Sequence, residues 1–263
     1  MRDEDYSDAP AVAPLGRRQM LQATAAAAMT AALVPAALAD ARARAVAFDG
    51  FVIFDPRPVY GRLESLFPGK GNEIAGLWRT RQFEYAWLRT LTGRYADFWQ
   101  VTGEALAYAT TAAGVVLTKD QHATLMQGWL ELKAHPDVLP GLQALRAAGI
   151  RLGFLSNLTA HMLEAGIASA GLDGLFEQLL STDRVRAYKP DPRAYQMGID
   201  AFGLNREQIV FAAFGGWDAN GARSFGYRTY WANRLKQPVE QMDAKPDAIG
   251  AGVGELVQFV AKA

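Results

Sequence analysis

Short apolar runs of strand length alternate with helix-like segments along most of this chain. The runs are AVAFD (45–49), GIRLGFLSN (149–157), QIVFAAF (208–214) and TYWAN (229–233). Between them, segments such as HMLEAGIASAG and AYQMGIDAFG carry apolar residues at helical spacing. Buried strands that alternate with helices are typical of a parallel sheet covered on both faces. The sequence therefore predicts an α/β fold with a doubly wound parallel-sheet (Rossmann-like) core.

The region from residue 55 to residue 134 lacks this strand pattern. Its apolar residues recur at helical spacing in RLESLF, EIAGLWRTRQFEYAWLRTL and EALAYATTAAG. Thr118 and Gln121 fit a capping box, and Leu125, Trp129 and Leu132 are expected to continue on one face of that helix. We expect a helical cap over residues 55–134, inserted into a core formed by residues 40–54 and 135–263.

The amino-acid composition argues against several classes of function. Half of the 263 residues are hydrophobic, and 27 Lys and Arg balance 27 Asp and Glu, so a nucleic-acid partner is not indicated. The chain has no cysteine, which excludes disulfides, thiol catalysis and thiolate metal sites. His122, His135 and His161 form no metal-binding pattern, so we expect no metal ion.

The first forty residues have a different character. RRQML (17–21) precedes the apolar run ATAAAAMTAALVPAALA (23–39), which ends in an A-x-A pattern. Together these features resemble a twin-arginine (Tat) export signal, which implies the Tat export machinery as a partner and a periplasmic location. The alternatives are an Ala-rich helix of the domain or a membrane anchor, but the run is shorter than the roughly 20 residues of a membrane span. We assign residues 1–39 to the signal.

The stretch AVAFDGFVIFD (45–55) has two interpretations. An Asp-Gly pair between apolar runs is typical of a β-hairpin. Alternatively, a parallel strand ends on Asp49 and presents its carboxylate at the edge of the sheet, where ligands bind in such folds. Ser156, Asn157 and the segment after Phe214 also follow strand-like runs. We favour the strand-end interpretation, because an all-helical region follows and three later strands can pair with the first.

Several motifs follow one another in a specific order: Asp49, LWRTRQFEYAWLR (77–89), LSN (155–157), YKPDPRAY (188–195) and GGWDANGARSFG (215–226). In this order they resemble the type II (S)-2-haloacid dehalogenases of the haloacid dehalogenase (HAD) superfamily, over essentially the whole mature chain. The resemblance implies a HAD-like hydrolase acting on the carbon–halogen bond of short L-2-haloacids, without a cofactor, and a homodimer. In that family an Asp displaces halide from C2, and water then hydrolyses the aspartyl ester to a 2-hydroxy acid.

The resemblance also implies residue roles. Asp49 matches the nucleophile, Lys189 the cation that keeps it ionised, and Asp218 the acidic residue near the ester. The residues that it implies for substrate and halide binding are Arg79, Ser156, Asn157 and Tyr195. The residues that it implies for an apolar wall of the site are Phe51, Phe83, Phe98 and Trp217. Arg79 lies in an apolar helix-like segment, where a buried cation needs a partner. Each role has a structural alternative, such as a turn residue, a helix cap, a surface charge or a core aromatic ring.

Three features depart from the family pattern. DGFVIFD is one residue shorter than the family's D-x-Y-G-T-L-F-D and lacks its Thr, and we expect Gly50 to free the backbone of the shortened loop. Ala213 and Gly215 stand where the family has a Ser and an Asn that hold the hydrolytic water. Ester hydrolysis should therefore be damaged more than ester formation. A periplasmic binding protein or weakly active vestigial dehalogenase is the alternative; a HAD phosphatase is less favoured, because Phe51 replaces its second Asp.

Overall fold

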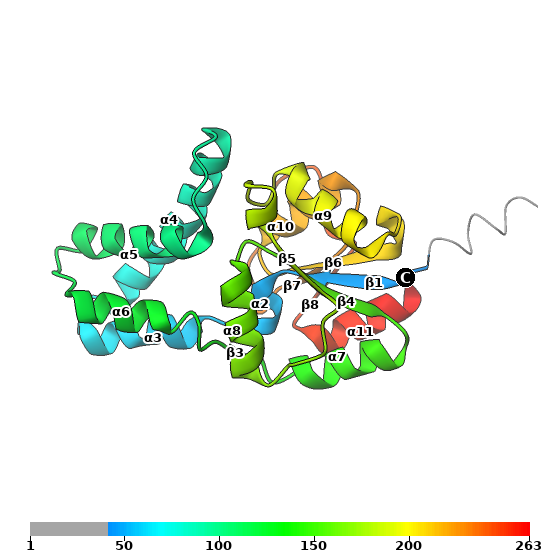
Figure 1. The fold of residues 1–263 in the computed structure, drawn as a ribbon, viewed down its shortest axis with the longest axis horizontal. Coiled ribbons are helices and arrows are strands. Elements are labelled where there is room, and N and C mark those ends of the chain that lie inside the picture. The colour runs from blue at the N-terminus through cyan, green and yellow to red at the C-terminus, as the bar shows by residue number, and fades with distance from the viewer. Residues whose placement is uncertain (1–41) are drawn as a thin grey trace, which may run out of the picture. The chain divides into compact units, whose positions relative to one another are not determined.

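The core of the protein is a six-stranded sheet whose strands all run parallel. The computed structural model describes residues 42–263. The strand order is β5 (Gln178–Ser181), β4 (Arg151–Ser156), β1 (Ala45–Phe48), β6 (Ile209–Ala213), β7 (Arg228–Ala232) and β8 (Ala248–Gly250). β1 lies in the middle, between β4 and β6 (Figure 1). The predicted doubly wound parallel sheet is confirmed.

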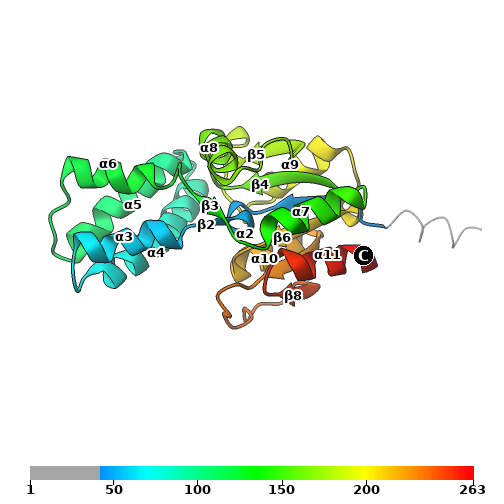
Figure 2. The same cartoon turned by 90° about the horizontal axis from the view of Figure 1, so that it is seen from below.

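Helices cover both faces of this sheet. α9 (Pro192–Phe202) and α10 (Gly216–Phe225) lie on one face, and α7 (Val138–Ala147) and α11 (Val253–Lys262) lie on the other (Figures 1 and 2). Successive side chains of a strand point to opposite faces. Accordingly Val46 and Phe48 pack in the cluster that contains α7 and α11, whereas Ala45 and Ala47 pack with α9 and α10. α8 (Ala160–Ala170) connects β4 to β5.

All four predicted strands are confirmed, with ends that differ by one or two residues. β5 and β8 were not predicted. β5 has four residues, QLLS, and β8 has three, AIG, so neither contains an apolar run long enough to stand out. Both lie at the edges of the sheet, where a strand has only one neighbour and is only partly buried. The sequence of such a strand is therefore less strongly constrained to be apolar.

The hairpin interpretation of AVAFDGFVIFD is wrong. β1 pairs in parallel with both neighbours, and residues 50–53 form a one-turn helix, α2 (Gly50–Ile53). The Asp49 side chain caps this helix by accepting a hydrogen bond from the Phe51 N–H at 2.9 Å. Asp49 therefore stands at the carboxyl end of the central strand.

Four helices make up most of residues 57–127: α3 (Arg57–Leu66), α4 (Gly71–Leu91), α5 (Phe98–Ala112) and α6 (Lys119–Gln127). The capping box between Thr118 and Gln121 at the start of α6 is confirmed. However, α6 ends before Trp129 and Leu132, so the prediction that both continue on its face is wrong. The chain turns at Gly128, a poor helix former, and both side chains are buried beyond the helix.

A two-stranded antiparallel sheet marks where the chain enters and leaves these helices. It consists of β2 (Phe54–Asp55) and β3 (Lys133–Ala134). The predicted cap boundaries at 55 and 134 fall on this pair, and the division into core and cap stays a prediction. Within residues 42–263 no helix is long and apolar enough to cross a membrane. The predicted signal at residues 1–39 lies outside the described residues.

Candidate active site

Three titratable side chains meet at the carboxyl edge of the sheet. Nζ of Lys189 lies 2.7 Å from Oδ2 of Asp49 and 2.7 Å from Oδ2 of Asp218. Asp49 follows β1, Asp218 lies in the first turn of α10 after β6, and Lys189 lies in the segment between β5 and α9. All three are buried. The fold thus brings together the three residues that the sequence singled out for catalysis.

Neighbouring side chains fix this cluster in place. The Tyr195 hydroxyl donates to Oδ1 of Asp218 at 2.7 Å. The backbone N–H of Lys189 donates to Oδ1 of Asn157 at 3.1 Å, and the indole N–H of Trp87 donates to the Lys189 carbonyl at 3.2 Å. The segment that carries Lys189 is therefore held both by the end of β4 and by α4.

Burial and mutual attraction set the charges of the cluster. Burial raises the pKa of Asp218 to about 6, although Lys189 opposes the rise and Asp49 adds to it. Burial alone would lower the pKa of Lys189, but Asp218 and Asp49 hold it above its ordinary value. Burial and the Asp218 charge raise the pKa of Tyr195 well above its ordinary value. At neutral pH Lys189 is therefore charged and Tyr195 is a neutral hydrogen-bond donor.

The raised pKa of Asp218 predicts a pH dependence of stability. The folded pKa of about 6 exceeds the ordinary value of 3.8, so between these values the folded state binds more protons than the unfolded state. The contribution of Asp218 to the free energy of unfolding therefore falls as the pH rises from about 4 to about 6. Urea unfolding of the wild type and of Asp218→Asn should show a difference in stability that changes in this direction. A difference that is constant with pH would contradict the shift.

Asp49 and Asp218 open into a cavity of about 620 Å³ that α4 borders. Aromatic side chains supply much of its wall: Phe51, Phe83, Trp87, Phe214, Trp217 and Trp231. The ring centroid of Trp217 lies 5.3 Å from that of Phe83 and 5.3 Å from that of Trp87. Such a wall limits the access of water to the two carboxylates.

Arg79 reaches this cavity from α4. Its side chain is exposed, so the expectation of a buried cation that needs a partner is wrong. The reason is the face of α4 on which it lies: Trp78 and Gln82 are buried, whereas Arg79 borders open space. Arg79 also lines a neighbouring cavity of about 260 Å³. It has no hydrogen-bond or ion-pair partner among residues 42–263, so its guanidinium is free to bind an anion.

The remaining predicted site residues lie in different surroundings. Ser156 accepts a hydrogen bond from the Leu158 N–H at 3.1 Å. Nδ2 of Asn157 is buried and has no partner in the described part of the chain. Phe98 does not line the cavity, which corrects its predicted place in the apolar wall. It is fully buried at the start of α5, where its ring centroid lies 6.1 Å from that of Tyr188.

Gly50 is required for space and not for an unusual backbone angle. Its backbone is helical, which corrects the expectation that it frees the loop. A Cβ at this position would lie 2.7 Å from Cδ1 of Leu158 and 2.8 Å from Oγ of Ser156. The helix that begins at the nucleophile thus packs directly against the end of β4.

Sequence reasoning missed three aromatic residues of the cavity. Trp87 lies one turn after Phe83 on α4, so helical spacing could have identified it. Phe214 and Trp231 lie at the ends of β6 and β7, at the same edge of the sheet as Asp49. The rule that ligands bind at this edge could have pointed to both.

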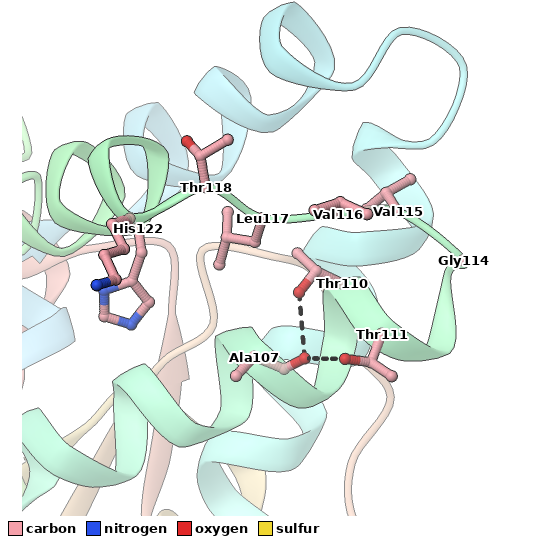
Figure 3. A pocket seen from close by; sticks show the side chains of 10 residues that line it. Ala107, Thr110, Thr111, Gly114, Val115, Val116, Leu117, Thr118 and His122 are labelled. Atoms are coloured by element: carbon pink, nitrogen blue, oxygen red, sulfur yellow. Dashed lines mark hydrogen bonds between the residues drawn. The ribbon is translucent and has the colours of Figure 1, made fainter.

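A second cavity of about 630 Å³ lies between α5 and α6 (Figure 3). The hydroxyls of Thr110 and Thr111 both donate to the Ala107 carbonyl, at 3.1 Å and 2.9 Å. Among the described residues no carboxylate lines this cavity. Its titratable lining residues are Lys119 and His122. In residues 42–263, moreover, no three His, Cys, Asp or Glu side chains are grouped to hold a metal ion.

Comparison with known proteins identifies the family. A family model for haloacid dehalogenase-like hydrolases matches residues 22–226. The chain belongs to the haloacid dehalogenase-like hydrolases. This hydrolase is 40% identical to an (S)-2-haloacid dehalogenase of Pseudomonas sp. (strain YL), over 78% of this chain and 88% of that protein. It is 38% identical to haloacetate dehalogenase H-2 of Moraxella sp. (strain B), over 82% of this chain and 97% of that protein.

Solved structures agree with this assignment. One L-2-haloacid dehalogenase is 44% identical to this hydrolase, with a TM-score of 0.82 and coverage of 84% of this chain and 99% of that chain. The enzyme from Xanthobacter autotrophicus with chloropropionic acid covalently bound is 32% identical, with a TM-score of 0.78 over 83% and 98% of the two chains. A HAD phosphatase from Thermococcus onnurineus, at 19% identity and a TM-score of 0.55, shares the fold. The predicted membership of the (S)-2-haloacid dehalogenase family is confirmed.

Proposed function

We propose that this hydrolase converts short L-2-haloacids into 2-hydroxy acids through an ester on Asp49. The observation that carries the proposal is the buried pair of Asp49 and Lys189, 2.7 Å apart, at the floor of an aromatic cavity. A buried carboxylate that pairs with an ammonium and is shielded from water is suited to nucleophilic attack. The relatives named above are dehalogenases, and one of them holds chloropropionic acid covalently.

In the first step, a carboxylate oxygen of Asp49 bonds to C2 of the substrate, and the halide leaves with the electron pair of the broken bond. Arg79 binds the halide and the substrate carboxylate from the cap side. Asn157 is the second halide donor. The buried and unpartnered Nδ2 of Asn157 supports this role, because a buried donor without a partner is unfavourable until a ligand accepts from it. The rings of Phe51, Phe83 and Trp217 shield the leaving halide from bulk water.

In the second step, water attacks Cγ of the ester and regenerates Asp49. Asp218 accepts a proton from this water, and Tyr195 orients the Asp218 carboxylate through its hydrogen bond. Lys189 offsets the negative charge that develops on the ester oxygen. Ser156, which lies beside the position of a Gly50 Cβ, binds the substrate carboxylate next to the nucleophile.

L-2-chloropropionate tests the proposal. Purified protein should release chloride, and rapid quenching should trap an intact-protein mass increased by the acyl portion of the substrate on Asp49. The D-enantiomer is the control for stereochemistry, and Asp49→Asn should form no ester. Absence of both chloride and adduct would favour the binding-protein alternative. Loss of activity with EDTA and recovery with Mg²⁺ would favour a phosphatase-like site.

Arg79→Lys is expected to reduce chloride release by about 10²-fold or more. A compact ammonium cannot match the planar fork of the guanidinium on a carboxylate and a halide together. Steady-state chloride assays measure the effect. Arg81→Lys is the matched control, because Arg81 instead binds Glu84 and stacks on Tyr108. Normal rates in Arg79→Lys would make Arg79 an ordinary surface charge.

We also propose that the protein is exported to the periplasm by the Tat route. The support is the Arg17-Arg18 pair, followed by a short apolar run and an A-x-A ending. Residues 1–43 fused to a reporter should send it to the periplasmic fraction, and changing both arginines to lysine should retain the reporter in the cytoplasm. Continued export of the Lys-Lys variant would reject this route.

The homodimer stays a proposal as well. Leu88 and Leu91 on α4 and Tyr108 on α5 expose apolar side chains. A second copy of the chain would remove this surface from water. Light scattering of the purified protein measures the mass in solution, and charged replacements of Leu88 and Leu91 should lower it if α4 forms the contact.

A further inference from the structure

Gly215 stands where the family has an Asn that holds the hydrolytic water. The space that an Asn side chain would enter is occupied by the ring of Trp217. A Cβ at Gly215 would lie 2.7 Å from Nε1 of Trp217, 3.0 Å from Cδ1 and 3.3 Å from Cε2. Real Cβ contacts essentially never fall below 3.0 Å. The nitrogen-bearing edge of the indole therefore lies where a side chain at position 215 would begin.

The ring of Trp217 is fixed in this position. Its centroid lies 5.3 Å from the centroids of both Phe83 and Trp87, and the rings are inclined at 58° and 78° to it. Inclined contacts of this kind stabilise aromatic pairs beyond the burial of their area. The two rings both come from α4, so the helix over the cavity restrains the indole.

The indole N–H of Trp217 is a donor without a partner. It makes no hydrogen bond with any residue in the described range 42–263. Trp217 lines the same cavity as Asp49, and it directly precedes Asp218 in α10. Nε1 also lies next to Gly215, a residue that lines the same cavity. An amphipathic ring with an unpartnered N–H beside a catalytic cavity is suited to hold one water molecule there.

We propose that the indole N–H of Trp217 positions the hydrolytic water, in place of the amide side chain that position 215 lacks. This inference rests on the proposed dehalogenase function. The water accepts a hydrogen bond from the indole and faces Cγ of the ester on Asp49. Its oxygen bonds to Cγ, and the bond from Cγ to the ester oxygen breaks. The product oxygen takes up one proton of the water, and the other proton leaves through Asp218 to solvent.

Trp217→Phe tests the role, because it keeps an aromatic ring between Phe83 and Trp87 but removes the N–H donor. We expect the rate of ester hydrolysis to fall by at least about tenfold. Ester formation, followed as halide released in the first turnover, should fall much less. The Asp49 adduct should accumulate to a higher steady-state fraction than in the wild type. Trp99→Phe in α5, away from the cavity, is the matched control and should leave both steps unchanged.

An exchange of donors separates a water-holding role from ring packing. In Gly215→Asn alone, the new side chain collides with Nε1 of Trp217, so turnover should drop. In Trp217→Ala/Gly215→Asn the whole colliding ring is gone and an amide donor is present. This double variant should hydrolyse the ester at least about tenfold faster than Trp217→Ala alone.

The outcomes are distinguishable. Wild-type turnover in Trp217→Phe, with no increase in adduct, would overturn the inference. Adduct accumulation in Trp217→Phe without recovery in the double variant would assign the loss to packing and would also overturn it. Absence of halide release by the wild type would instead refute the proposed function, and this inference with it.

Discussion

Lys189→Met is expected to abolish measurable dehalogenation and to lower the free energy of unfolding by about 3–5 kcal/mol. Lys189 is fully buried, and its ammonium is the shared partner of Asp49 and Asp218. Without it, two buried carboxylates face each other without a counter-charge, and one of them must take up a proton. The destabilisation should therefore be larger at pH 8 than at pH 5. Denaturant unfolding at both pH values measures it.

A second substitution tests whether charge is the cause. Lys189→Met/Asp218→Asn removes one of the uncompensated carboxylates and should recover much of the lost stability, but no activity. Lys119→Met, at an exposed lysine at the start of α6, is the control for loss of a lysine charge. If the changes in unfolding free energy of Lys189→Met and Asp218→Asn summed to that of the double variant, the two residues would not be coupled as the structure indicates.

Gly50→Ala is expected to reduce activity by about 10²-fold and to destabilise the protein by about 1–3 kcal/mol. The added methyl group would lie 2.7 Å from Leu158 and 2.8 Å from Ser156. Both side chains are buried, so neither can move into solvent. The start of α2 must shift instead, and Asp49 shifts with it. Chloride release and urea unfolding measure the two effects.

Gly61→Ala is the matched control for this substitution. Gly61 lies within α3, and apart from its own helix backbone and chain neighbours nothing lies within 4 Å of its added Cβ. Alanine in an exposed helix interior is more favourable than glycine by about 0.5–1 kcal/mol. The control should therefore be slightly stabilised and fully active. A Gly50→Ala variant with normal activity would show that the packing of α2 on β4 does not position the nucleophile.

Much of the fold could be predicted because strands that are buried in the middle of the sheet have recognisably apolar sequences. β1, β4 and β6 are covered on both faces; β1 and β6 are accordingly apolar throughout, and β4 has polar side chains only at its two ends, Arg151 and Ser156. Edge strands receive no such constraint, which is why β5 and β8 escaped detection. The end of α6 was also mispredicted, because Trp129 is buried by tertiary packing against Phe51 and not by a helical face.

The candidate site was predictable where a carboxylate directly follows a strand, as for Asp49, whereas Asp218, in the first turn of α10, was identified by the family resemblance. The position of a side chain around its helix is harder to predict. The roles of Arg79 and Phe98 came from the family resemblance, which does not specify how a side chain is turned: Arg79 is exposed to the cavity, and Phe98 does not line it. The contact of Trp217 with Gly215 depends on the ring packing of two residues from α4, which no local pattern encodes.

Because β2 and β3 pair with each other, the helical segment between these two strands could be replaced by the corresponding segment of a relative. Phe54 is paired with Ala134 and Asp55 with Lys133, so the two points at which the chain crosses are adjacent. Antiparallel partners lie about 5 Å apart, a gap that a two-residue turn spans. A chimera could therefore receive the equivalent helices of a relative at residues 55 and 133 without disturbing the register of the six-stranded sheet. Such grafts would replace Arg79, Phe83 and Trp87 as one unit, while the Asp49–Lys189–Asp218 cluster stays with its scaffold.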